Sequence, residues 1–174
     1  MSLRPLLLLP LIAGCLLARI EAGPSLPLTE DPRPVVAIEA QVSYTAVFYA
    51  AGIRARAKVS SDAQQLAFGP QFGLQIPFVG LSENLGFVGI MGGIHLVQFD
   101  RAPGISGASI GTPFLVPSFA LPVHAVERES IMLTLSVPME YNIRLHPDLR
   151  SRPMVGVLLG VQYVLWPKKP RFRR

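Results

Sequence analysis

Apolar and small polar residues alternate with a period of two along most of this chain. In residues 130–145, every odd-numbered residue from Ile131 to Leu145 is apolar, and most even-numbered residues are polar. Such strict alternation indicates β-strands, because successive side chains of a strand point to opposite faces. The sequence therefore predicts an all-β fold.

Turn-forming residues divide this region into seven predicted strands: 37–49, 53–59, 65–79, 85–99, 109–126, 130–145 and 154–166. The four most regular run about 13 to 16 residues, whereas strands in soluble proteins usually have five or six. A tilted strand needs about 9–11 residues to cross the hydrocarbon core of a membrane. These lengths therefore favour membrane-spanning strands.

The polar faces carry Gln, Ser, Thr, Gly and Asn, and only 16% of all residues are charged. A soluble sheet would carry more charge on its solvated face, since ordinary soluble domains have roughly 25% charged residues. Small polar side chains suit the inside of a narrow barrel, which leaves the apolar faces to contact lipid. Because every backbone group must be paired in lipid, the strands must close. We predict an antiparallel up-and-down β-barrel of about eight strands.

The few charged residues in the strands have a spacing that allows pairing inside the barrel. Arg54, Arg56 and Lys58 share one face of the short strand 53–59, and Glu140 and Arg144 share the polar face of 130–145. Together with Glu39, these side chains are candidates for an interior ion-pair network. A gating or catalytic role is the alternative for Glu140 and Arg144, and an extramembrane edge is the alternative for the short strand.

Aromatic residues occur towards the predicted strand ends, where membrane proteins place their interfacial girdles. The alternative is an ordinary preference of aromatic residues for strand ends. The candidate interface residues are Tyr44, Tyr49, Tyr141, Tyr163 and Trp166.

Residues 1–22 have the pattern of a secretory signal peptide. Arg4 provides a positive start, and the apolar run 6–18 is short and interrupted by Pro10, unlike a membrane-spanning helix. Cleavage after Ala22 is one interpretation of this segment.

A second interpretation of the N-terminal segment is a lipoprotein signal covering residues 1–14. Residues 12–15 (Ile-Ala-Gly-Cys) resemble the bacterial lipobox, which would make Cys15 a lipidated first residue. Both cleavage interpretations stay open. Cys15 is the only cysteine, so no intramolecular disulfide is expected.

The remaining segments complete the predicted organisation. Residues 23–35 form a proline-rich spacer, residues 36–166 the barrel, and residues 167–174 a basic tail. The net charge of +5 could suggest a nucleic-acid partner, but five basic residues lie in that tail. A nucleic-acid-binding face would need basic residues interleaved with aromatic ones along the body. We therefore expect no nucleic-acid partner.

Residues 36–166 resemble the small outer-membrane β-barrels of Gram-negative bacteria, the OmpA/OmpX-like eight-stranded group. Residues 160–166 look like the terminal-strand signal that the barrel assembly machinery reads. The resemblance implies an outer-membrane location, contact with outer-membrane lipid or lipopolysaccharide, and envelope proteins as partners. Eight strands leave little lumen, so a structural or interaction protein with a narrow, filled interior and no open pore is expected.

Two features favour a different fold. Seven strands are an odd number, whereas bacterial barrels have even numbers. Proline cannot donate to a β-ladder and prefers edges and bulges. The alternative is therefore a periplasmic, lipid-anchored β-sandwich or lipocalin-like barrel that binds an apolar ligand. The prolines within predicted strands are Pro70, Pro77, Pro113, Pro117, Pro122 and Pro138.

Enzymatic motifs, cofactor sites and metal sites are not evident. A lipid A deacylase of the barrel type carries a His-x-Ser pair, but His95, His124 and His146 are followed at the second position by Val97, Val126 and Asp148. We expect no enzyme and no cofactor. A lipid A-modifying barrel using His124 beside Glu127 is kept as a third alternative.

Overall fold

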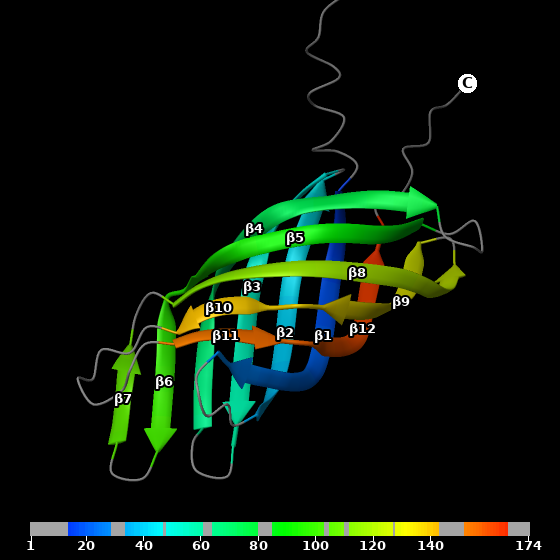
Figure 1. The fold of residues 1–174 in the computed structure, drawn as a ribbon. Helices are drawn as coiled ribbons and strands as arrows, with labels where there is room; N and C mark the ends of the chain where they lie inside the picture. The colour runs from blue at the N-terminus through cyan, green and yellow to red at the C-terminus, as the bar shows by residue number, and fades with distance from the viewer. Residues whose placement is uncertain are drawn as a thin grey trace, which may run out of the picture.

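The computed structural model describes residues 14–28, 34–46, 48–60, 64–79, 85–102, 105–109, 112–126, 128–142 and 152–166. They form one twelve-stranded antiparallel sheet (Figure 1). Within these ranges, no helix is long and apolar enough to cross a membrane. The strands are β1 (Gly14–Pro27), β2 (Val35–Ala46), β3 (Tyr49–Val59), β4 (Gln64–Val79), β5 (Leu85–His95), β6 (Val97–Ala102), β7 (Ile105–Ser109), β8 (Thr112–Val126), β9 (Glu129–Ser136), β10 (Met139–Asn142), β11 (Arg152–Gly156) and β12 (Leu158–Leu165).

Eight long wall strands account for these twelve elements, because four wall strands are interrupted. Only Leu96 separates β5 from β6, and only Val157 separates β11 from β12. Residues 110–111 separate β7 from β8, and residues 137–138 separate β9 from β10. Consecutive wall strands are hydrogen-bonded neighbours, as in an up-and-down barrel.

The last wall strand returns to the first and closes the barrel. β12 pairs with β1 from Leu16↔Leu165 to Ala22↔Leu159, and β11 continues this seam at Ser25↔Gly156. The predicted closed antiparallel barrel of about eight strands is thereby confirmed. The β-sandwich alternative is wrong, because a sandwich consists of two sheets packed face to face. Here, pairing of the first and last wall strands closes a single sheet.

The strand missing from the sequence-based count is β1. It lies in the segment predicted to be signal peptide (1–22) and spacer (23–35), so the barrel begins at Gly14 and not at residue 36. The alternation of inward and outward side chains runs through β1 as through the other strands. The apolar run at 6–18 hid this period in the sequence. Residues 1–13 and the tail 167–174 lie outside the described part of the chain.

The strand prolines lie where the ladder is incomplete, which explains why a closed barrel tolerates them. Pro70 separates the part of β4 that pairs with β6 from the part that pairs with β5. On one side of β8, Pro117 separates the residues paired with β10 from those paired with β9. Pro122 begins a register shift, and Pro138 interrupts the wall strand between β9 and β10.

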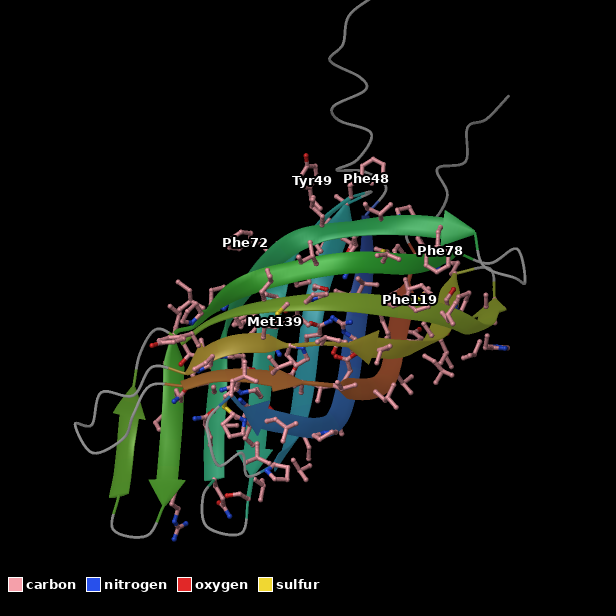
Figure 2. The ribbon with its side chains drawn as sticks, in the orientation of Figure 1. Phe48, Tyr49, Phe72, Phe78, Phe119 and Met139 are labelled. Carbon is pink, nitrogen blue, oxygen red and sulfur yellow. The ribbon has the colours of Figure 1, made fainter. Side chains whose placement is uncertain are left out.

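Side chains on the two faces of the wall differ sharply in chemistry. Inward positions are rich in buried Arg, Glu, Gln, Ser and Thr. Outward positions carry exposed apolar side chains on every wall strand, and Figure 2 shows Phe72 and Phe119 projecting from it. Representative outward residues are Ile20, Ile38, Val42, Ile53, Leu66, Phe72, Ile76, Val88, Leu115, Leu133, Leu135, Leu159 and Val161.

Candidate functional site: the barrel interior

Five charged side chains meet inside the barrel. Arg54 Nε donates to Glu39 Oε2 at 3.0 Å, and a second Arg54 nitrogen contacts the other Glu39 oxygen. From the opposite wall, Glu140 receives Lys58 Nζ at 2.8 Å on Oε2, and Arg56 contacts the same oxygen. Arg54 Nη2 lies 3.9 Å from Glu140 Oε1 and links the two groups. We name Glu39, Arg54, Arg56, Lys58 and Glu140 the ion-pair cluster.

The strands place these residues together for a simple geometric reason. Glu39 on β2 is the register partner of Arg56 on β3, and the inward period of β3 continues from Arg54 through Arg56 to Lys58. β10 brings Glu140 from the other side of the barrel. A carboxylate far away in sequence thus becomes the shared partner of three cations.

Burial makes this cluster energetically demanding. Arg54 and Arg56 are each only 1% exposed, so their desolvation must be compensated by pairing. Part of the compensation comes from neighbours. Arg56 Nη2 donates to Gln65 Oε1 at 2.5 Å, and the Arg54 guanidinium lies 4.5 Å from the centre of the Phe114 ring, a cation–π distance.

Five of the six residues predicted for an interior network are therefore brought together by the structure: Glu39, Arg54, Arg56, Lys58 and Glu140. Arg144 lies outside the described residues.

A second polar group comes from β1. Arg19 Nη1 lies 3.6 Å from Glu21 Oε1, and Ser136 Oγ on β9 donates to Glu21 Oε2 at 2.7 Å. Both β1 side chains are buried. This group was not predicted from the sequence, because residues 19 and 21 were assigned to the signal peptide.

An apolar group occupies the interior near the start of β1 and the end of β12. Trp166 packs against it, stacks on Phe87 at 6.0 Å between ring centroids, and donates from Nε1 to Ser130 Oγ at 3.1 Å. We name the following residues the apolar cluster: Cys15, Leu17, Phe87, Ala120, Met132 and Val164, with Trp166.

Cys15, the lipidation candidate, is a free cysteine with its side chain buried in the apolar cluster. A lipid on its sulfur would have to leave the barrel interior at the start of β1, and this requires Cys15 to leave the cluster. Lipidation at this position stays a prediction.

The candidate interface aromatics fall into two groups. Tyr44, Tyr49, Tyr141 and Tyr163 are exposed on the outer face, as a girdle requires. Trp166 differs, because it continues the inward period of Gln162 and Val164 and packs against the interior. Other outward aromatics not singled out from the sequence include Phe78 and Phe119, whose rings stack at 5.2 Å (Figure 2).

The histidines do not form a recognisable catalytic group in the described part of the chain. His95 is buried with its ring 4.5 Å from that of Phe114, and His124 is exposed on β8. His146 and Glu127 lie outside the described residues. No group of three or more His, Cys, Asp or Glu suited to a metal ion occurs among the residues described.

Comparison with known proteins gives a likeness in structure only. No family model matches the sequence, and no curated protein matches it. Among solved structures, the chain is similar to Neisserial surface protein A (NspA), with a TM-score of 0.57 and 9% sequence identity. The match covers 86% of this chain and 95% of NspA. The predicted resemblance is thus confirmed for the fold: this chain forms a closed eight-stranded antiparallel barrel and is similar in fold to NspA.

Proposed function

We propose that this chain is an outer-membrane β-barrel protein of structural or interaction type, with a filled interior and no open pore. The observation that carries the proposal is the inverted side-chain distribution, with exposed apolar residues on every wall strand and buried charges inside. Soluble monomers rarely expose apolar patches larger than a few hundred Å². A bilayer is the environment in which an apolar belt and a closed ladder are both favourable.

Support for a filled interior comes from two groups of side chains at different heights. The ion-pair cluster joins β2 and β3 to β10 across the barrel, and the apolar cluster joins β1, β5, β8, β9 and β12. Their members are almost completely buried, except Trp166, which is partly buried. An apolar ligand in the lumen would have to displace buried ion pairs, so the lipocalin-like alternative receives no support from the interior.

The connections suggest an orientation in the membrane. At the end where β1 begins and β12 ends, residues 47–48, 80–84 and 127–128 connect neighbouring strands. At the opposite end, residues 28–34, 60–63, 103–104 and 143–151 connect them, and two of these four segments are longer than any at the first end. Outer-membrane barrels have short periplasmic turns and long extracellular loops. We propose that the end with the apolar cluster faces the periplasm.

The proposed partners follow from this setting. The outer belt contacts outer-membrane lipid, including lipopolysaccharide, and envelope proteins bind at the exposed ends. The ion pairs serve the fold and not catalysis, because each carboxylate is engaged by buried cations. Neither a cofactor nor a nucleic acid is part of the proposal.

Two measurements test this function. Expressed with its own N-terminus in a Gram-negative host, the protein should fractionate with the outer membrane and migrate differently on a gel before and after heating. In planar bilayers, the folded protein should give no stepwise conductance. Solubility without detergent would contradict the membrane location, and regular open-channel steps would contradict the filled interior.

A further inference from the structure

We propose that the folded protein retains residues 16–22 as the central part of β1, so that the chain is not cut after Ala22. The inference concerns processing and holds for a closed barrel in any membrane. It decides between the two cleavage interpretations of the N-terminal segment, of which only a cut before Cys15 leaves these residues in place.

Residues 16–22 form most of the seam between the first and last wall strands. Every register pair between β1 and β12 involves a residue from Leu16 to Ala22. A cut after Ala22 would remove all of these pairs and leave, between the first and last wall strands, the contacts of residues 24–28 with residues 153–157. β12 and most of β2 would then present unpaired backbone groups to lipid, which a spanning barrel does not tolerate.

The interior gives a second, independent argument. The same cut would remove Leu17 from the apolar cluster and Arg19 and Glu21 from the polar group beside it. Ser136 Oγ would lose its buried acceptor on Glu21. Leu17 is 0% exposed and Arg19 only 2%, so both side chains fill space that no other described residue occupies.

A glycine on β12 also fits the close approach of β1 at Glu21. Gly160 is the register partner of Glu21, and a Cβ atom at Gly160 would lie 2.7 Å from Glu21 Cγ and close to the Ile20 carbonyl oxygen. A side chain at residue 160 would therefore collide with β1. Glycine weakens a strand interior unless another chain segment approaches closely, and β1 provides that segment.

The direct test is the mass of the folded protein. The complete chain is expressed with its own N-terminus, the heat-modifiable species is purified from the outer-membrane fraction, and its intact mass is measured. We expect a mass that includes residues 16–22, with or without attached lipid at Cys15. A folded species that begins at Gly23 would overturn the inference.

A matched pair of fusions tests the same point through folding. An unrelated cleavable leader is joined either directly before Gly14 or directly before Gly23. We expect the Gly14 fusion to give a heat-modifiable barrel and the Gly23 fusion to give at least ten times less of it. Equal yields of folded barrel from both fusions would overturn the inference while leaving the outer-membrane location untouched. If neither leader is processed, the mass of the native chain still decides the question.

Discussion

The inward-facing side chains are apolar at one end of the barrel interior and charged towards the other end. Near the chain ends, the apolar cluster fills the lumen with groups that need no partner. Towards the longer connections, the ion-pair cluster fills it with charges that tolerate burial only when paired. The period of two therefore determines which side chains point inward. The residue types at each height determine whether apolar packing or ion pairing holds the interior together.

This difference predicts two different responses to substitution. Loss of volume in the apolar cluster should destabilise in proportion to the cavity that remains. Loss of one charge in the ion-pair cluster should leave the remaining buried charges unpaired. The resulting loss of unfolding free energy should be far larger than the change in side-chain volume suggests. Each variant is compared with the unmodified protein by unfolding in urea, and the heat-modifiable gel shift measures the folded fraction.

The largest effect is expected for Glu140→Gln, which preserves shape but removes the carboxylate that pairs with Lys58 and Arg56. Leaving buried cations unpaired should lower the free energy of unfolding by about 3–5 kcal/mol. Glu129→Gln, at an exposed carboxylate, is the control and should change it little. Adding Lys58→Gln to Glu140→Gln should restore part of the loss. A loss below about 1 kcal/mol in the single variant would contradict the importance of the ion pairs.

The next effect is expected for Met132→Ala in the apolar cluster. Met132 is fully buried, so truncation should leave a cavity and cost about 2–5 kcal/mol of unfolding free energy. Leu133→Ala, the neighbouring outward position, removes no interior packing and should cost less. Equal losses from the two variants would argue against a packed interior at this end.

A smaller effect is expected for Arg54→Lys, which keeps the charge but not the fork that contacts both oxygens of Glu39. Lysine is a point donor and also loses the planar stacking on Phe114. We expect a loss of about 1.5–3 kcal/mol, the usual contribution of a hydrogen bond to a charged group. Stability equal to that of the unmodified protein would show that charge alone, without geometry, holds the cluster together.

The smallest effect is expected for Trp166→Phe, which should preserve the stack on Phe87 and remove the hydrogen bond to Ser130 Oγ. The loss should be about 0.5–1.5 kcal/mol, as for a neutral hydrogen bond. Ser130→Ala should give a similar loss, and the double variant should lose less than the sum. Strict additivity would show that the two side chains do not interact.

Much of the barrel could be predicted from the period of two, because the apolar outer face and the packed side chains inside both depend on it. β1 could not be predicted, because Arg4 and the apolar run 6–18, which overlaps the start of β1, also fit a signal peptide. The clue was Arg19 and Glu21, two charges separated by one residue on the face of Cys15 and Leu17. The partners of Glu140 required the closed fold, since sequence spacing does not show which distant strands face each other across a lumen.

β1 closes the barrel against β12, and a disulfide across that seam tests this closure most directly. In a Cys15→Ser background, Ala18→Cys and Tyr163→Cys place two thiols on register partners that both face outward. Oxidation should join them and alter migration on a nonreducing gel, as it should for the control pair Val42→Cys and Ile53→Cys between β2 and β3. Crosslinking of the control pair without crosslinking of the seam pair would contradict closure by β1.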